Sequence, residues 1–235
     1  MSGESRAAPV TLRLTFLAIV FESVVGILAG VLAGLRKDRF ADNFVRVVTV
    51  LAISVPIFVL GVLTQIVFGL YIGNWVRDRG APDWVQAIFS VSYQSDYPWA
   101  SLVIPAMVLG ATTLGVVARM TRTGLIESLR SDYVRTGRAK GLKPRRIVGI
   151  HALRNCLIPV ITLIGIDIGT LMAGAIVTEG IFNIPGIGGL VYRAAVTGET
   201  AIIMAVVPLL VLVYLVASLL VDLMYAVLDP RIRYG

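Results

Sequence analysis

Residues 118–159 read ARMTRTGLIESLRSDYVRTGRAKGLKPRRIVGIHALRNCLIP, and they hold ten lysine and arginine residues. The apolar runs on either side, at about residues 101–117 and 157–178, approach the roughly 20 helical residues that cross a hydrocarbon core. A basic segment between two such runs is typical of a loop on the cytoplasmic side of a membrane. The stretch therefore predicts an all-α integral membrane protein.

The composition of the whole chain agrees with a membrane fold. Of 235 residues, 57% are hydrophobic and 15% are charged, and the net charge is +7. A soluble domain carries about a quarter charged residues. The basic residues lie in short connecting segments and not in one patch, so no nucleic-acid partner is predicted. A single cysteine, Cys156, excludes an internal disulfide and favours a small buried side chain.

The apolar runs predict five spanning helices, at about residues 11–35, 45–73, 101–117, 157–178 and 201–228. In the first, Gly26, Gly30 and Gly34 lie four residues apart, where small residues let a neighbouring helix approach closely. We expect Pro56 to kink the second. Residues 74–99 are polar and rich in tryptophan and tyrosine, which is typical of a membrane–water boundary.

The lysine and arginine residues also predict an orientation. Segments 36–46, 119–154 and 229–235 together hold 16 of them, and the segments on the other side hold 5. Cytoplasmic loops carry the excess of positive charge. The C-terminus is therefore expected in the cytoplasm, and five spans would leave the N-terminus outside, without a visible signal peptide to export it.

Within the basic segment, the sequence predicts two short helices joined by an elbow. Ser131 is a good N-cap, Gly141 is placed as a helix stop, and Pro144 suits the first turn of the next helix. Gly137 and Ala139 are small, so we expect a large partner to approach the backbone at these two positions. A solvated loop that only obeys the positive-inside rule is the alternative.

The residues of this segment resemble a known family. DYVRTGRAKGL at residues 132–142, followed by HALRN and LIPVIT, closely resembles the cytoplasmic loop of permeases in peptide and nickel ABC importers. VTEGIFNIPGIGGLVYRA at residues 177–194 resembles their external segment before the last span, and DPRIRYG at residues 229–235 resembles their C-terminal signature. The resemblance runs from Val10 onward and is nearest to dipeptide permeases of high-GC Gram-positive bacteria.

The resemblance implies the transmembrane domain of a type I ABC importer over residues 11–228. Residues 1–10 would be an extracytoplasmic lead-in, residues 119–156 a cytoplasmic coupling loop, and residues 229–235 a cytoplasmic tail. The family has a further N-terminal span, which would place both termini in the cytoplasm. We therefore expect this sequence to lack the first helix of its family.

The resemblance also implies a function. The chain would be a multi-pass permease subunit of the bacterial cell membrane that forms half of a pathway for dipeptides or oligopeptides. The implied partners are a second homologous permease, two ABC ATPase subunits and an extracytoplasmic peptide-binding lipoprotein. ATP and magnesium would bind on the ATPases, so no cofactor is expected in this chain. Nickel or haem in place of peptides stays open.

In the resembled family, a short helix of the cytoplasmic loop docks into a groove on the ATPase. The implied coupling residues are Asp132, Tyr133, Val134, Arg135, Thr136, Gly137, Arg138, Ala139, Lys140 and Gly141. Gly137 departs from the alanine that is common in the family. Glycine there lowers helix stability by up to ~1 kcal/mol relative to alanine.

Polar residues inside the predicted spans are costly in lipid, so Glu22, Gln65, Asp167 and Asp222 should face protein or water. Asp167 lies between Gly165 and Gly169 near the middle of its span. It is a candidate for the translocation pathway, and a buried hydrogen bond between helices is the alternative.

Glu179 and Glu199 are expected near the outer surface, as candidate contacts for the binding protein or as part of a solvated rim. No G-x-x-x-x-G-K-[ST] phosphate loop occurs, and His151 is the only histidine, so neither ATP hydrolysis nor a metal site is predicted in this chain. A secondary transporter or channel usually shows internal repeats and broken helices, and neither pattern is found.

Overall fold

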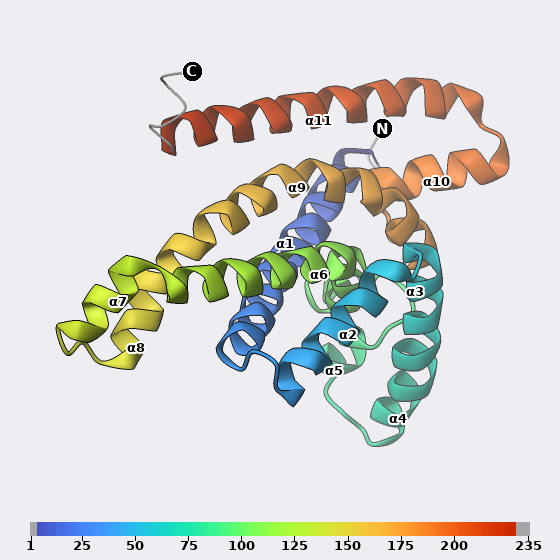
Figure 1. The fold of residues 1–235 in the computed structure, drawn as a ribbon. Coiled ribbons are helices and arrows are strands. Elements are labelled where there is room, and N and C mark those ends of the chain that lie inside the picture. The colour runs from blue at the N-terminus through green and yellow to red at the C-terminus, as the bar shows by residue number, and fades with distance from the viewer. Residues whose placement is uncertain (1–3, 229–235) are drawn as a thin grey trace. The chain divides into compact units, whose positions relative to one another are not determined.

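The computed structural model describes residues 4–228, with the side chains of residues 7–172, 175–208 and part of 210–219. Within that range every regular element is a helix (Figure 1). The four long helices are α1 (Glu4–Leu35), α6 (Val103–Arg130), α9 (Leu153–Ile181) and α11 (Thr200–Leu228). The shorter ones are α2 (Phe40–Ser54), α3 (Ile57–Thr64), the π-helix η1 (Gln65–Ile72), α4 (Gly73–Asp78), α5 (Asp83–Ile88), the 3-10 helix η2 (Ala100–Leu102), α7 (Asp132–Ala139), α8 (Pro144–Arg146), the π-helix η3 (Ile147–Ala152) and α10 (Ile187–Thr197).

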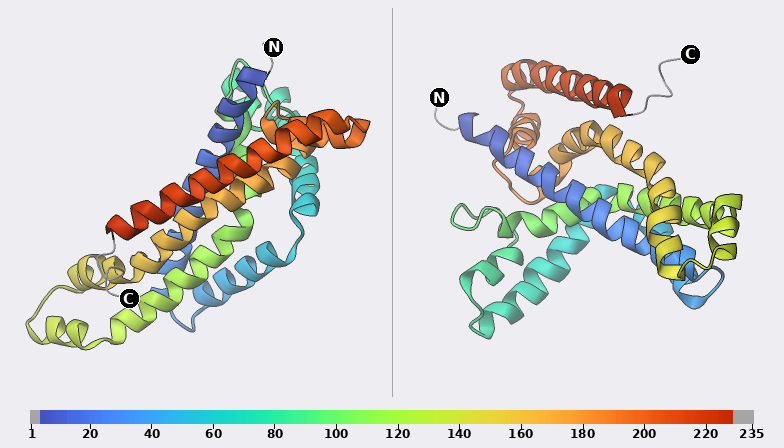
Figure 2. Two further views of the ribbon diagram at one scale, coloured as in Figure 1. Left: turned by 90° about the horizontal axis from the view of Figure 1, so that it is seen from above. Right: turned by 90° about the vertical axis from the view of Figure 1, so that its left-hand side faces the viewer.

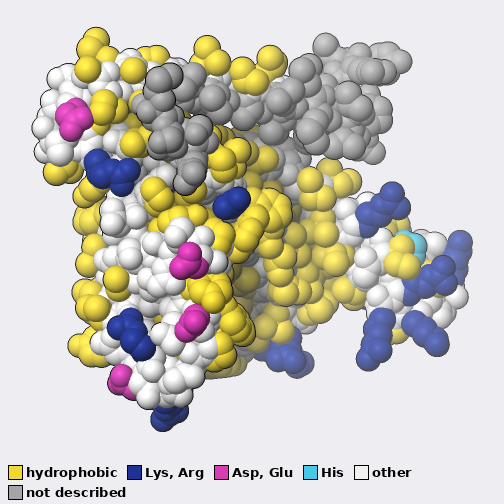
Figure 3. All heavy atoms as spheres, turned by 180° about the vertical axis from the view of Figure 1, so that it is seen from behind, with side chains coloured by type: hydrophobic (Ala, Val, Ile, Leu, Met, Phe, Trp, Pro, Cys, Tyr) yellow, Lys and Arg dark blue, Asp and Glu magenta, His cyan; other side chains and the backbone are white. Residues whose placement is uncertain are grey.

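The apolar helices confirm the predicted membrane fold. Four helical segments of the described chain are long and apolar enough to span a bilayer: Ala7–Leu35, Ile57–Asp78, Ala100–Arg130 and Pro144–Met172. The fifth predicted span falls on α11, whose described apolar stretch is the shorter Thr200–Leu212. Hydrophobic side chains also dominate the face drawn in Figure 3. Such a surface is stable where lipid, and not water, surrounds it.

The predicted span at residues 45–73 is not one helix. α2 ends at Ser54 and α3 begins at Ile57, because Pro56 adopts an extended backbone with φ −56° and ψ 138°. Proline also disfavours the helical region for the residue before it, so Val55 leaves the helix. The chain is broken here and not merely kinked, and the segment able to span a membrane runs from Ile57 to Asp78.

Other predicted bounds were too narrow. α1 begins at Glu4, so most of the lead-in at residues 1–10 belongs to the first helix. α6 continues to Arg130, and the helix that begins at Pro144 runs through α8 and η3 into α9. Arginine, lysine and glutamate are good helix formers, so leaving the hydrocarbon does not end these helices. The predicted loop at residues 119–156 is therefore mostly helical, and its irregular residues lie on either side of α7.

The chain divides into two compact units. The first consists of the chain up to Val20, residues Val55–Gly110 and the chain from Ile166 onward, and the second consists of Phe21–Ser54 and Ala111–Gly165. α1, α6 and α9 each contribute one part to each unit.

The first unit has an apolar core that holds α1, α6 and α9 together. Its largest fully buried members are Leu14, Leu102, Phe182 and Ile184. Gln65, a polar residue of a spanning segment, faces this protein interior as predicted, since its Nε2 donates to the carbonyl oxygens of Val91 at 2.9 Å and Ile181 at 3.1 Å.

In the second unit, the glycines of α1 lie against α6. A Cβ atom on Gly30 would lie 2.5 Å from the carbonyl oxygen of Ala118, and one on Gly26 would lie 2.8 Å from Cγ1 of Val117. Gly34 faces the next turn of α6. Contacts this short leave no room for a side chain. The predicted close approach at the three glycines is confirmed.

Candidate functional site

The elbow between α6 and α9 is built around α7, as Figures 1 and 2 show. Ser131 occupies the N-cap position with an extended backbone (φ −69°, ψ 156°). Its Oγ donates to the carbonyl oxygen of Ser128 at 2.5 Å and makes no capping bond to α7. Gly141 has a φ of +74°, in the left-handed region that favours glycine, and Pro144 is the first residue of α8. The predicted stop and restart of the helix are confirmed.

One face of α7 packs on the elbow itself. Val134 and Gly137 are buried. A Cβ atom on Gly137 would lie 3.5 Å from Cδ1 of Leu142 and 3.9 Å from Cγ1 of Ile147. Gly137 therefore faces the protein interior, and the prediction that a partner approaches the helix at Gly137 is wrong. A short amphipathic helix must bury one face, and here this face meets the residues that follow it.

The opposite face of α7 is open to a partner and basic. Its exposed residues are Asp132, Tyr133, Arg135, Thr136, Arg138, Ala139, Lys140 and, just beyond the helix, Gly141. Nη1 of Arg135 lies 3.4 Å from Oδ1 of Asp132, but the two side chains are 77% and 96% exposed. Such a pair contributes little to stability, so these charges remain available for contacts with another protein.

A hollow of about 180 Å³ lies beside α7. It is lined by Leu129, Arg138, Leu142, Pro144, Ile147 and Val148. An apolar floor with an arginine at its edge suits an apolar side chain of a partner next to a carboxylate. The sequence analysis did not single out this hollow, because Leu129 and Ile147 reach it from opposite ends of the elbow.

The elbow stands on a small apolar cluster. Leu125, Ala152 and Cys156 are buried together, with Leu129 and Leu153 packed against them. Cys156 has the small, buried packing role that its isolation in the sequence predicted. The cluster joins the end of α6 to the start of α9, so the base of α7 is held by packed side chains.

The charged residues of the spans face protein, as predicted. Glu22 is fully buried and the exposed fraction of Asp167 is 9%. Charged groups within spans normally lie against other protein groups or water. The side chain of Asp222 lies outside the described residues, as does the predicted tail at residues 229–235.

Glu179 is buried, so its predicted place at the outer surface is wrong. Its exposed fraction is 0%, and its Oε2 accepts a hydrogen bond from the backbone N–H of Gly189 at 2.7 Å. A Cβ atom on Gly186 would collide with the same carboxylate. The chain after α9 folds back over this side chain, which local sequence does not reveal. Glu199 is exposed, as predicted.

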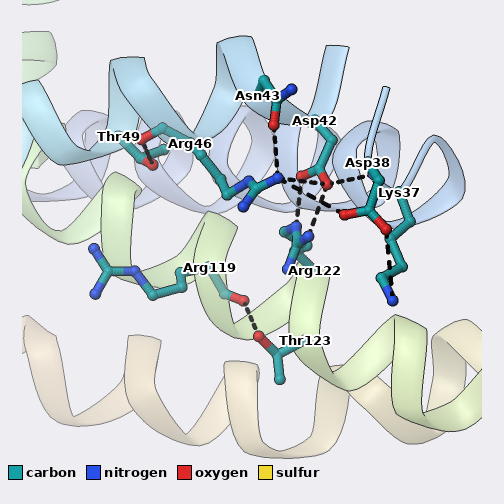
Figure 4. Close-up of polar contacts among 9 residues, drawn as sticks. All are labelled: Lys37, Asp38, Asp42, Asn43, Arg46, Thr49, Arg119, Arg122 and Thr123. Atoms are coloured by element: carbon teal, nitrogen blue, oxygen red, sulfur yellow. Dashed lines mark hydrogen bonds and ion pairs between the residues drawn. The ribbon is translucent and has the colours of Figure 1, made fainter. Parts of the chain in front are cut away.

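The sequence analysis missed an ion pair in the second unit (Figure 4). Asp42 of α2 is fully buried and accepts hydrogen bonds from Nε of Arg122 at 2.5 Å and from Nη2 of the same residue at 2.7 Å. The backbone N–H of Asp38 donates to it at 2.9 Å. The bonded Arg122 guanidinium lowers the pKa of Asp42 from 3.8 to about 2. Eighty positions separate the partners, so no local pattern could have paired them.

A comparison with known protein families agrees with the fold described above, an all-helical membrane protein with a basic elbow. Residues 26–234 match the family described as "Binding-protein-dependent transport system inner membrane component". The chain belongs to this family. Its members are permease subunits of ABC importers and not enzymes, and separate subunits hydrolyse ATP.

Three relatives of this inner membrane component are more than 30% identical to it. The di/tripeptide transport system permease protein DppB of Pseudomonas aeruginosa is 38% identical over 242 residues, which cover 96% of this chain and 71% of that protein. The dipeptide transport system permease protein DppB of Alkalihalophilus pseudofirmus is 34% identical, with 95% and 71% covered. The glutathione transport system permease protein GsiC of Escherichia coli is 36% identical, with 98% and 70% covered.

A solved structure shares the fold of this inner membrane component. An inward-facing structure of the MetNI methionine ABC transporter superposes with a TM-score of 0.72 at 20% identity, and 96% of both chains is covered. A second crystal form of the same transporter gives a TM-score of 0.69. The predicted fold, the transmembrane domain of a type I ABC importer, is confirmed.

Proposed function

We propose that this permease subunit forms half of a membrane pathway for dipeptides or oligopeptides. Three relatives that span nearly the whole chain are named for di/tripeptide, dipeptide and glutathione transport. Glutathione is itself a peptide, so the three names agree in the class of cargo. A second permease of similar fold would supply the other half, and an extracytoplasmic binding protein would deliver the peptide.

The coupling site of this proposal is the exposed face of α7. The observation that carries it is the division of α7 into two faces, with Val134 and Gly137 packed on the elbow and the basic face open. Thr136 and Ala139 lie on the open face, where a neighbouring subunit can reach them. Val134 and Gly137 hold the helix in place and do not touch the partner. ATP and magnesium belong to the ATPase that this face contacts.

The elbow would lie on the cytoplasmic side, since 16 of 21 lysine and arginine residues lie in the segments assigned to that side. The C-terminus lies on the same side in this proposal. Glu199, which is exposed just before α11, would then lie on the outer side, as a candidate contact for the binding protein.

Substitution of Thr136 tests the docking face. We expect Thr136→Trp to prevent co-purification of the ATPase subunits and to abolish peptide-stimulated ATP hydrolysis, because an indole there blocks close approach. Thr197→Trp is the matched control for ATPase co-purification, since Thr136 and Thr197 are both exposed helical threonines whose Oγ1 donates to the carbonyl four residues earlier at 3.0 Å. Normal ATPase binding by the Thr136 variant would contradict the docking assignment.

Asp167 is the candidate residue of the pathway. Of the two acidic residues of α9 in the first unit, Asp167 and Glu179, only Asp167 lies within the apolar segment Pro144–Met172, and its exposed fraction in the single chain is 9%. We expect Asp167→Asn to change the rate of peptide uptake or the preference among peptides of different charge, while the complex still assembles. Uptake by reconstituted vesicles measures the effect. Loss of assembly would instead assign Asp167 to helix packing.

A further inference from the structure

A groove of about 430 Å³ lies beside the buried ion pair, between α2 and α6. Three arginines line it, Arg46, Arg119 and Arg122, together with the apolar side chains of Val45, Val50 and Ala118. All of these residues belong to the second unit. The groove therefore combines a positively charged end with an apolar wall, and the proposed coupling site includes none of these residues.

The three arginines differ in how far neighbouring carboxylates neutralise their charge. Arg122 is neutralised by Asp42, to which it donates two hydrogen bonds. Arg46 donates to Oδ1 of Asn43 at 2.6 Å, lies 3.4 Å from Asp42, and has a half-exposed side chain. The guanidinium of Arg119 has neither a carboxylate nor another acceptor within hydrogen-bond distance among the described residues, and Figure 4 shows it free of dashed contacts. The groove thus has a net positive charge.

The depth of Arg119 and Arg122 in the membrane, measured along α6, indicates which kind of anion the groove can bind. The apolar part of this helix, residues 101–117, is about 26 Å long at 1.5 Å per residue, close to the thickness of a hydrocarbon core. Arg119 and Arg122 are the first charged residues after it. They therefore lie at the level where lipid phosphates meet the acyl chains.

The outer face of α2, on the side of the helix away from the groove, is apolar. Phe40, Phe44, Val47 and Leu51 are exposed on it, and the rings of Phe40 and Phe44 stack with centroids 6.2 Å apart. An apolar face opposite a basic one is what an amphipathic helix at a membrane interface presents. The apolar face of α2 therefore indicates that the groove on its other side lies at the same interface.

We propose that the groove binds the headgroup of an anionic phospholipid. Arg119 and Arg46 donate hydrogen bonds to the phosphate oxygens, and an acyl chain lies along the apolar wall of the groove, formed by Val45, Val50 and Ala118. Basic pockets between helices on the cytoplasmic side of a membrane protein are suited to such headgroups. This lipid site goes beyond the transport of peptides and does not depend on which cargo is carried.

The test measures lipid retention by the purified importer complex in native mass spectrometry. After delipidation, the complex is titrated with phosphatidylglycerol or with phosphatidylcholine. We expect preferential binding of phosphatidylglycerol, and we expect Arg119→Gln to weaken that binding about fivefold, the effect of one arginine near a lipid surface. Arg130→Gln on the same helix is the matched control, because Arg130 is exposed but does not line the groove, and it should leave binding unchanged.

Three outcomes would overturn the proposal. Equal retention of phosphatidylglycerol by the Arg119 and Arg130 variants would place the lipid elsewhere. Displacement of the lipid by millimolar inorganic phosphate would assign the groove to a soluble anion. Failure of a maleimide to label Arg119→Cys in the lipid-free complex, when the same residue is labelled in the isolated permease, would show that another subunit covers the groove.

Discussion

At the scale of single residues, Gly137 shows that the sequence motif and the contacts in the structure lead to different conclusions about one position. Its small size suggested a position that a partner approaches, but its missing side chain points at Leu142 and Ile147 of the same chain. Thr136 and Ala139, its neighbours in sequence, lie on the open face. Contact with the ATPase is therefore expected at these two residues, and Gly137 only needs to fit the elbow.

Gly137→Ala should stabilise α7. The added methyl group would lie 3.5 Å from Cδ1 of Leu142, an ordinary van der Waals distance, and alanine is favoured in a helix by up to ~1 kcal/mol. We expect amide exchange of residues 132–139 to slow by up to about fivefold in hydrogen-exchange mass spectrometry. Gly141→Ala, at a φ of +74°, should speed exchange instead. Faster exchange in the Gly137→Ala variant would show that position 137 has less room for a methyl group than the 3.5 Å distance to Leu142 indicates.

At the scale of helices, two kinds of contact join α6 to its neighbours in the second unit. The glycines of α1 allow the backbones to approach, which their spacing predicted. The ion pair between Asp42 and Arg122 joins α2 to α6, and neither residue was marked by its local sequence. Breaking a buried pair is costly, because the remaining charge is left without its partner.

Asp42→Asn should destabilise the contact between α2 and α6. The pKa of Asp42 is lowered from 3.8 to about 2, so its ion pair contributes about 2 kcal/mol of stability above pH 4. Because the folded-state pKa is the lower one, this stability is lost as the pH falls from about 4 to about 2. Thermal unfolding of the purified complex between pH 2 and pH 7 measures both effects.

Asp38→Asn is the control for this prediction. The Asp38 side chain is 70% exposed and pairs only loosely with Lys37 and Arg46, at 3.7 Å and 3.9 Å, so its removal should change little. Equal loss of stability in the Asp38 and Asp42 variants would mean that the buried ion pair contributes no more to the free energy of unfolding than the exposed contacts of Asp38 do.

At the scale of the whole molecule, the distribution of charge and the positions of the spans together predict an orientation. The basic elbow and the polar segment at residues 74–99 are predicted on opposite sides of the membrane. Trp75, Trp84 and Trp99 of the polar segment are about half exposed, as residues at a membrane boundary require.

Cysteine labelling tests the orientation. In intact cells whose outer layers have been removed, a membrane-impermeant maleimide should label Asp96→Cys and should label Lys143→Cys, which lies outside the proposed docking face, only after the membrane is opened. Both positions are exposed in the structure. The native Cys156 is 2% exposed, so the unmodified chain should give a low background. Labelling of Lys143→Cys before the membrane is opened would reverse the proposed topology.

The sequence by itself determined the features that depend on local chemistry. Long apolar runs specify helices in lipid, because backbone groups there must be satisfied within the segment. Gly141 and Pro144 mark the end of α7 and the start of α8, since left-handed glycines and prolines act on their nearest neighbours. The family followed from the same local strings.

The tertiary structure decided which face of each element is buried. It turned Gly137 inward, covered Glu179 with the chain that follows α9, and paired Asp42 with an arginine 80 positions away. It also extended α6 and α9 beyond the hydrocarbon and broke the second span at Pro56. Burial and pairing depend on residues distant in sequence, so patterns within one helix cannot specify them.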